Sequence, residues 1–323
     1  ALLELGCAVT GVDCLTDYYD PALKHENMAG FVDHERFSFV REDLQQVDAV
    51  ALLAGKAACF HLAAQAGVRA SWGREFADYV GRNILATQNL LEACKDPAVA
   101  GGLKRFVYSS SSSVYGDQPE LPVTEQALPQ PRSPYGVTKM AAEHLCVLYS
   151  MNFGVPTSSL RYFTVYGPRQ RPDMAFRKFI EAALDGRTFE VYGDGSQTRD
   201  FTYVGTVCAT ITDAIRRGVT SDEPVNLAFG SRITLLDTLE LLEEILGHPI
   251  ARDHVENRKG DVPHSQADNS LLRNLFPDVT PVDLHEILGE VLLMLGQARL
   301  FQSDTRGALE VLDPDVLGED SDP

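Results

Sequence analysis

Tyr135 and Lys139 are the residues whose types and spacing point most directly to chemistry in this sequence. They are four residues apart, so on a helix both side chains share one face. An ammonium held beside a phenol favours the phenolate and lowers the phenol pKa from its usual value of about 10. The pair therefore predicts a base that removes a proton from a hydroxyl group. Because a Tyr-x-x-x-Lys spacing also arises by chance, the rest of the chain must support this interpretation.

The helix that has to position this pair is marked at its start. Ser133 is a good N-cap, because its hydroxyl can accept a hydrogen bond from a backbone N–H of the first turn. Pro134 suits the first helical position, where no N–H is needed. We therefore expect a helix over 135–152.

The elements around that helix alternate between short apolar segments and helical ones. We expect strands at 9–13, 37–40, 58–64 and 105–109, and a further helix over 78–94. Short apolar strands alternating with helices predict an α/β fold with a parallel, doubly wound sheet.

The second half of the chain is more mixed. Residues 166–202 are rich in Gly, Pro, Arg and aromatic residues, which is typical of a segment that faces a substrate. Gly247 is a stop signal for the amphipathic helix that we expect before it. The remaining expected elements are strands at 157–162 and 224–227, a helix at 234–246 and an acidic tail at 301–323.

Composition and charge exclude several classes of protein. The chain has 323 residues, 44% of them hydrophobic, which fits one large α/β unit or two modest domains. A formal net charge of −18 argues against a nucleic acid or a membrane surface as a partner. The six cysteines are dispersed without a Cys-x-x-Cys pair, so we expect no metal site and no disulfide framework, and a cytoplasmic protein.

The start of the chain lacks a feature that a dinucleotide-binding sheet normally has. Such a sheet opens with a strand, a glycine-rich turn and a helix, whereas Ala1–Gly6 look like the end of that helix. The first strand usually lies in mid-sheet, and without it the neighbouring strands would expose unpaired backbone groups. We therefore expect that the first strand and the glycine turn are missing from this sequence, and that the native protein has further N-terminal residues.

Several runs, in order along the chain, carry a resemblance to a known family. They are Val12–Pro21, His61–Arg69, Ser109–Gly116, the Tyr135/Lys139 pair, Arg161–Pro168 and Gly193–Phe201. Together they resemble the extended short-chain dehydrogenase/reductase family, in its nucleotide-sugar epimerase branch, over about residues 1–295. Within that branch, the runs Asp17–Asp20 and Arg171–Met174 make the chain most similar to UDP-glucuronate 4-epimerases.

The resemblance implies a Rossmann-like domain with a smaller C-terminal substrate domain. The expected NAD-binding domain is 1–165 with about 203–230. The expected nucleotide-sugar-binding domain is 166–202 with 231–300. As in the family, we also expect a homodimer in which the helices over 78–94 and 135–152 pair with their copies.

The cofactor that the resemblance implies is NAD. Asp13 ends a strand at the position where a carboxylate binds the adenosine ribose, and it would repel the 2′-phosphate of NADP. As bare residues, most of the matching positions would be ordinary core or cap residues. The family's other cofactor-binding positions are matched by Asp43, Leu44, Leu62, Ala63, Ala64, Asn83, Tyr135, Lys139 and Tyr162.

By the same resemblance, Ser111 joins Tyr135 and Lys139 as a catalytic residue. It would hydrogen-bond the sugar 4-hydroxyl and relay its proton to Tyr135. A serine run is usually a polar loop, but this one follows a strand at the carboxyl edge of the sheet, where ligands bind. The next residues, Ser112 and Ser113, stand where related dehydratases and many decarboxylases carry acids. This disfavours a dehydratase, and a decarboxylase less strongly.

The resemblance also implies a site for a UDP-sugar. Arg171 matches an arginine that faces the sugar carboxylate in the epimerases, where a bidentate guanidinium can resist loss of CO2. Its alternative is a surface arginine in a basic loop. The other substrate-binding positions are matched by Ser111, Ser112, Ser113, Thr164, Val191, Tyr192, Arg199, Arg258 and Asp261.

Three functions follow as hypotheses. The first is an NAD-dependent 4-epimerase that interconverts UDP-glucuronate and UDP-galacturonate through a 4-keto sugar. The second keeps the same oxidation but loses CO2, giving a UDP-4-keto-pentose or UDP-xylose. The third is a non-catalytic protein that binds NAD or a nucleotide sugar.

Overall fold

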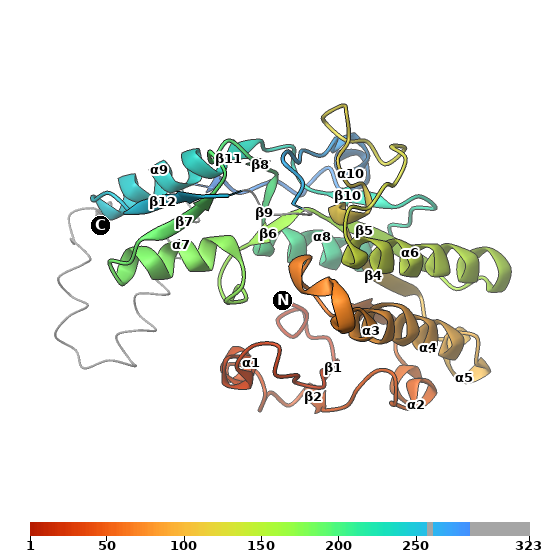
Figure 1. The fold of residues 1–323 in the computed structure, drawn as a ribbon. Helices are drawn as coiled ribbons and strands as arrows, with labels where there is room; N and C mark the ends of the chain where they lie inside the picture. Colours follow the sequence, from red (N-terminus) through yellow and green to blue (C-terminus); the bar gives the residue numbers. More distant parts are fainter. Residues whose placement is uncertain (257–260, 285–323) are drawn as a thin grey trace, which may run out of the picture.

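A four-stranded parallel sheet forms the centre of the fold. It is built from β3 (Ala58–His61), β4 (Arg105–Ser111), β5 (Thr157–Tyr162) and β10 (Val225–Leu227), in the spatial order β10-β5-β4-β3 (Figure 1). The structure is a computed structural model, and it describes residues 1–256 and 261–284. Residues 106–111 of β4 are all buried, because β4 has a strand on either side and helices against it.

The first two strands lie apart from this sheet. β1 (Val9–Val12) and β2 (Phe37–Val40) pair in parallel as a sheet of their own. The predicted parallel α/β fold is thus confirmed, but the strands expected from the sequence form two parallel sheets and not one. Within the described residues, β1 pairs only with β2 and β3 pairs only with β4, so no strand joins the two sheets. The strand expected ahead of β1 stays a prediction.

Helix α6 (Pro134–Phe153) carries Tyr135 and Lys139, as predicted, and extends one residue further at each end. The Ser133 hydroxyl accepts a hydrogen bond from Gly136 N at 3.1 Å, which caps its first turn. Gly154, with φ of +68°, ends it in the left-handed conformation that favours glycine. The helix packs along β4 and β5, so its first turns lie at the carboxyl ends of these strands.

The helix expected over 78–94 is a continuous helical run with a change of pitch inside it. α3 (Phe76–Tyr79) passes into a π-helical segment, Val80–Leu85, and then into α4 (Ala86–Ala93). Wide turns of this kind often occur at functional sites. Here the segment holds Asn83 with only 1% of its surface exposed. The other helices of this half are α1 (Pro21–Met28), α2 (Ala49–Leu53) and α5 (Pro97–Ala100).

A second group of elements lies at one end of the molecule in Figure 1. It contains α7 (Ala175–Leu184), α9 (Leu235–Leu246), and the parallel pair β7 (Phe189–Tyr192) and β12 (Arg252–Val255). Phe179, Val191, Leu239 and Leu242 pack together in its core. The capping box of Thr234 and Asp237 starts α9, and Gly247 ends it, as predicted.

The remaining elements lie between or beside the two groups. β6 (Thr164–Tyr166) and β9 (Phe201–Tyr203) pair in parallel between them. The others are β8 (Thr198–Arg199), β11 (Ile233–Thr234), α8 (Val204–Arg217) and α10 (Ser270–Leu275). None of the described helices combines the length and the apolar character that crossing a membrane requires. The domain boundaries stay a prediction, and the tail over 301–323 lies outside the described residues.

Candidate functional site

A cleft of about 1100 Å³ opens at the carboxyl ends of β4 and β5. Its walls come from segments far apart in the sequence, including the loop after β1, the loop after β3 and the segment before α7. This is the edge of a parallel sheet where ligands bind. The predicted site residues that line it are Ser111, Ser112, Ser113, Tyr135, Tyr162, Thr164, Arg171, Tyr192, Arg199 and Asp261.

Ser111 and Tyr135 meet in this cleft. Ser111 is the last residue of β4, and its Oγ accepts a hydrogen bond from Ser113 N at 3.2 Å. This bond caps the 3₁₀ turn Ser112–Val114 and fixes the Ser111 side chain. The Ser111 hydroxyl also lowers the pKa of the Tyr135 phenol, so the two side chains lie close enough to influence each other. The proposed proton relay therefore has its two hydroxyl groups in the same cleft.

The pKa of Tyr135 is set by its burial and its neighbours. Burial raises the pKa of its phenol, while the hydrogen bond with Ser111 and the charge of Arg171 lower it. The lowering of the phenol pKa by Lys139 stays a prediction, and Arg171 is a further cation that acts on Tyr135.

Lys139 lies deeper, one helical turn below Tyr135. Its Nζ is 4.6 Å from the centre of the Tyr108 ring, and the residue is 3% exposed. Burial lowers the pKa of its ammonium to about 8, against the opposing influence of Cys146 and Glu143. Within residues 1–256 and 261–284, this ammonium donates no hydrogen bond and forms no ion pair. A buried cation without such partners is suited to bind the hydroxyls of a ligand.

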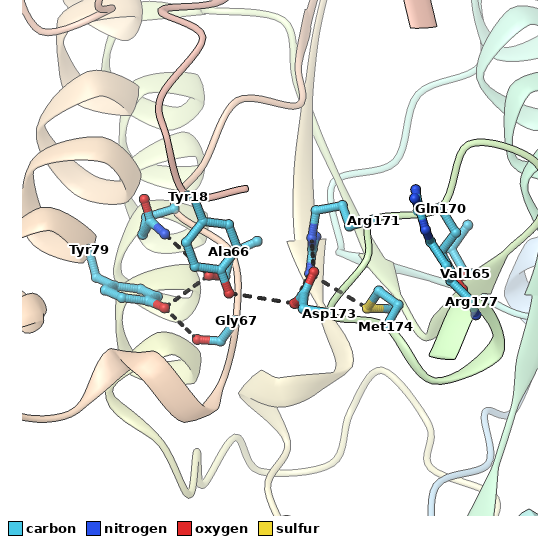
Figure 2. Close-up of polar contacts among 11 residues, drawn as sticks. Tyr18, Ala66, Gly67, Tyr79, Val165, Gln170, Arg171, Asp173, Met174 and Arg177 are labelled. Atoms are coloured by element: carbon cyan, nitrogen blue, oxygen red, sulfur yellow. Dashed lines mark hydrogen bonds and ion pairs between the residues drawn. The ribbon is translucent and has the colours of Figure 1, made fainter. Parts of the chain in front are cut away.

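Arg171 belongs to a polar chain that crosses the cleft (Figure 2). Its Nε and Nη2 donate to the two carboxylate oxygens of Asp173, at 2.9 and 3.1 Å. Tyr18, from the loop after β1, donates to Asp173 Oδ2 at 3.5 Å. Beside it, the Tyr79 hydroxyl donates to the carbonyls of Ala66 and Gly67 at 2.9 and 2.6 Å. Arg171 is thus a fixed part of the cleft and not a surface arginine.

The residues predicted to bind the adenosine end lie at the ends of β1 and β2. Asp13 Oδ1 accepts from Leu15 N at 2.6 Å, and its side chain is 53% exposed, so the carboxylate can accept further hydrogen bonds. Asp43 Oδ1 accepts from Gln45 N at 2.9 Å. The Leu44 side chain packs against the core, and its carbonyl accepts from Asn89 Nδ2 at 2.7 Å.

The loop after β3 is the third predicted cofactor-binding segment. Leu62 and Ala63 are exposed and Ala64 is half-buried, so their backbone can be approached closely. Asn83 holds the loop: its Oδ1 accepts from Gln65 N at 2.6 Å, and its Nδ2 donates to Gln65 O at 3.1 Å. The same Nδ2 donates to Thr138 Oγ1 of α6 at 2.9 Å. Asn83 therefore ties this loop to the helix of Tyr135 and Lys139.

These positions fit the two ends of a dinucleotide. The half-exposed carboxylate of Asp13 suits ribose hydroxyls at one end, and the Lys139 ammonium, which has no hydrogen-bond acceptor in the described chain, suits the nicotinamide ribose at the other. The glycine turn expected to hold the pyrophosphate stays a prediction.

The far end of the cleft is cationic. Arg199 lines it, and burial and the charge of Arg69 lower the pKa of its guanidinium while Asp261 raises it. Arg69 Nη2 lies 3.4 Å from Asp261 Oδ2. The Cζ atom of the same guanidinium lies 5.9 Å from the centre of the Tyr192 ring. Two adjacent guanidinium groups suit a diphosphate.

One predicted substrate residue, Val191, does not line this end. Val191 has no exposed surface and packs in the core between α7 and α9, because its side chain points to the inner face of β7. Its prediction as a cleft residue is therefore wrong for the side chain. Arg258 lies outside the described residues.

Three cleft residues were not predicted individually: Tyr18, Arg69 and Asp173. Tyr18, Arg69 and Asp173 lie within runs that carried the family resemblance. Their partners are distant in the chain, since Tyr18 and Asp173 are 155 residues apart and Arg69 and Asp261 are 192 apart. Only the folded chain pairs them.

Comparisons with known proteins show the family of this chain. A family model described as the NAD dependent epimerase/dehydratase family matches residues 1–228. One relative is a protein of Bacillus subtilis named uncharacterized UDP-glucose epimerase YtcB. The two sequences are 40% identical, and the match covers 83% of this chain and 83% of that protein. A second relative is a UDP-glucuronate 4-epimerase of Thermodesulfobacterium geofontis. It is 37% identical to this chain, and the match covers 85% of this chain and 84% of that protein.

A solved structure is also similar to this chain. It is a UDP-glucuronic acid 4-epimerase of Bacillus cereus in complex with UDP-glucuronic acid and NAD. The TM-score is 0.84, with 39% sequence identity, over 91% of this chain and 93% of that one.

Proposed function

This chain belongs to the NAD dependent epimerase/dehydratase family as a nucleotide-sugar epimerase, and we propose that it interconverts UDP-glucuronate and UDP-galacturonate through a 4-keto intermediate. One observation carries the choice of a carboxylated sugar. Arg171 lies in the same cleft as Ser111 and Tyr135, and its charge acts on the Tyr135 phenol. A guanidinium beside the base is placed to bind a carboxylate next to the reacting carbon.

We assign the proton transfer to Ser111 and Tyr135. The C4 hydroxyl of the sugar donates its proton through Ser111 to the Tyr135 phenolate. When NAD is bound, it accepts the C4 hydride and later returns it. Both side chains line the same cleft, and Ser111 lowers the pKa of the Tyr135 phenol, so the relay needs no large movement of either side chain.

The second half of the reaction reverses these transfers on the other face of the sugar. The 4-keto sugar turns within the cleft, and Tyr135 returns the proton to the C4 oxygen. Lys139 holds the nicotinamide end of the dinucleotide with an ammonium that has no hydrogen-bond acceptor of its own in the described chain. Arg199 and Arg69 bind the diphosphate and Asp261 holds Arg69 in place, so the sugar can turn while the nucleotide stays bound.

The test is a product assay with a small panel of substrates. Full-length protein carrying NAD is incubated with UDP-glucuronate, UDP-glucose and UDP-N-acetylglucosamine, and the products are separated and weighed by mass spectrometry. We expect conversion of UDP-glucuronate to an isomer of the same mass that coelutes with UDP-galacturonate. A product lighter by CO2 would instead establish the decarboxylase, and turnover of UDP-glucose alone would overturn the proposed substrate.

A matched variant separates catalysis from binding. Tyr135→Phe removes the base and keeps the ring, so kcat is expected to fall about 10²- to 10⁴-fold. Retention of nearly full activity would rule out Tyr135 as the base. If no sugar is converted and no NAD is bound, the remaining hypothesis is a non-catalytic protein that binds a nucleotide sugar.

A further inference from the structure

The Arg171 guanidinium is held by only one of its edges. Asp173 accepts from Nε and Nη2, at 2.9 and 3.1 Å, which fixes the plane of the group. Its Nη2 also reaches the sulfur of Met174 at 3.5 Å. Within residues 1–256 and 261–284, Nη1 donates to no protein group. One edge of Arg171 is therefore committed to Asp173, and Nη1 remains available to a ligand in the cleft.

The segment that carries this pair is itself fixed at both ends. The Gln170 side chain donates to Val165 O of β6 at 3.0 Å, and it accepts from Arg177 N of α7 at 3.2 Å. The Arg177 guanidinium donates to Gln170 O at 3.2 Å. Because the backbone is fixed in this way, the direction of Arg171 depends on the side-chain contact with Asp173.

Tyr18 supports Asp173 from the opposite wall of the cleft. Its hydroxyl donates to Asp173 Oδ2, the same oxygen that accepts from Arg171 Nη2. The hydroxyl also lies against Gly67, where a Cβ atom would be 2.3 Å away and where φ is +101°. The structure thus leaves space at Gly67 for this phenol, so Tyr18 is built into the site.

We propose that Asp173 and Tyr18 are positioning residues that aim the free edge of Arg171 at the sugar carboxylate and thereby keep the 4-keto intermediate from losing CO2. This inference rests on the proposed function, because it needs a carboxylated substrate. Arg171 binds the carboxylate, Asp173 sets the direction of Arg171, and Tyr18 sets the direction of Asp173. Neither Asp173 nor Tyr18 takes part in proton or hydride transfer.

The chemistry of the side reaction shows why direction matters. After oxidation at C4 the intermediate is a β-keto acid, and its C5–C6 bond can break. The bonding electron pair then passes to the C4 carbonyl as an enolate, CO2 leaves, and water supplies a proton to C5. The carboxylate loses its negative charge in this step, so a fixed cation that binds the charged form opposes it. A misdirected Arg171 would oppose it less.

The experiment measures how each variant divides the 4-keto intermediate between two products. Wild type, Asp173→Asn and Tyr18→Phe are incubated with UDP-glucuronate labelled with ¹³C at C6. Released ¹³CO2 and UDP-galacturonate are quantified together. We expect the ratio of CO2 to epimer to rise about tenfold in Asp173→Asn, through loss of a charged hydrogen-bonded pair, and about threefold in Tyr18→Phe. An unchanged ratio in both variants would overturn the proposal.

Tyr19→Phe is the matched control, because within the described residues the Tyr19 hydroxyl has no hydrogen bond and does not line the cleft. It should keep the wild-type ratio, and a rise equal to that of Tyr18→Phe would contradict the assignment. Thermal unfolding of each variant shows that the fold is retained. A purely structural role would change the melting temperature but not the product ratio.

A second measurement keeps this inference separate from the proposed function. If wild type converts UDP-glucose and not UDP-glucuronate, the proposed substrate is wrong. A crystal structure of Asp173→Asn with UDP then decides about positioning alone. Displacement of the Arg171 guanidinium supports the positioning role of Asp173, and an unmoved guanidinium contradicts it.

Discussion

Glu143 of α6 and Arg161 of β5 form an ion pair of 2.6 Å in which both side chains are almost fully buried. Ser110 of β4 donates to Glu143 Oε2 at 2.7 Å, so three elements meet at this carboxylate. Glu143 is one turn after Lys139 and two turns after Tyr135 on the same helix face. The pair therefore fixes that face against the strands that end at the cleft.

Removal of Glu143 should destabilise the protein strongly. In Glu143→Ala the Arg161 charge stays buried without its partner, which costs about 3–5 kcal/mol of unfolding free energy. The double variant Glu143→Leu with Arg161→Met removes both charges and is expected to recover most of that loss. Urea denaturation measures both, and equal destabilisation of the single and double variants would contradict the argument.

Lys139 should show a conflict between stability and activity. Its ammonium is buried and ordinarily has a pKa of about 10.4, which burial lowers to about 8 in the folded protein. Holding it charged at pH 7 costs about 3 kcal/mol. Lys139→Met removes this cost, so we expect a more stable protein at pH 7, without bound NAD, that has lost its activity.

The pH dependence of that difference has a definite sign. The folded pKa of Lys139 is below its unfolded value, so the unfolded chain binds more protons between about pH 8 and 10.4, and wild type gains stability over this range. The stability gap between Lys139→Met and wild type should therefore shrink as pH rises. Chemical denaturation of NAD-free protein at several pH values tests this, and a gap independent of pH would contradict it.

Arg171→Gln should shift the pH profile of the reaction. The Arg171 charge lowers the pKa of Tyr135, so its loss raises that pKa and moves the acidic limb of kcat to higher pH. Loss of the contact with the substrate carboxylate should also lower kcat/KM for UDP-glucuronate about ten- to a hundredfold. Arg216→Gln, on an exposed turn of α8, is the control that should keep the wild-type profile. An unshifted acidic limb in Arg171→Gln would remove Arg171 from the electrostatics of the base.

The dimer expected from the family resemblance has a candidate surface on α6. Val137, Leu148 and Met151 lie at helical spacing and are 42%, 52% and 78% exposed. We predict that Leu148→Glu with Met151→Glu converts a dimer to a monomer in light scattering coupled to size exclusion. Leu128→Glu changes an equally exposed apolar residue outside the helices and should leave the dimer intact. A monomeric wild type would contradict the prediction.

Local sequence signals were enough for the elements that build the site. The N-cap and proline before Tyr135 located α6, and the apolar runs located β4 and β5 to within two residues at each end. Cleft residues that follow a strand directly, such as Ser111, could be placed because parallel strands expose their carboxyl ends at one edge. These predictions depend on short-range patterns.

The parts that were missed depend on distant contacts. Arg171, which lowers the pKa of Tyr135, belongs to another part of the cleft and is 36 residues further along the chain. The contact between Tyr18 and Asp173 joins segments 155 residues apart. Val191 lies on a strand with one buried face, and sequence alternation alone did not show which face held the cleft.

The most direct test of the account is the fate of deuterium at C4. UDP-[4-²H]glucuronate is converted in ordinary water by protein carrying its own NAD, and the product is examined by NMR and mass spectrometry. Removal and return of hydride at C4 predicts UDP-galacturonate of unchanged mass with deuterium still at C4. Protium at C4, or a product that has lost CO2, would contradict it.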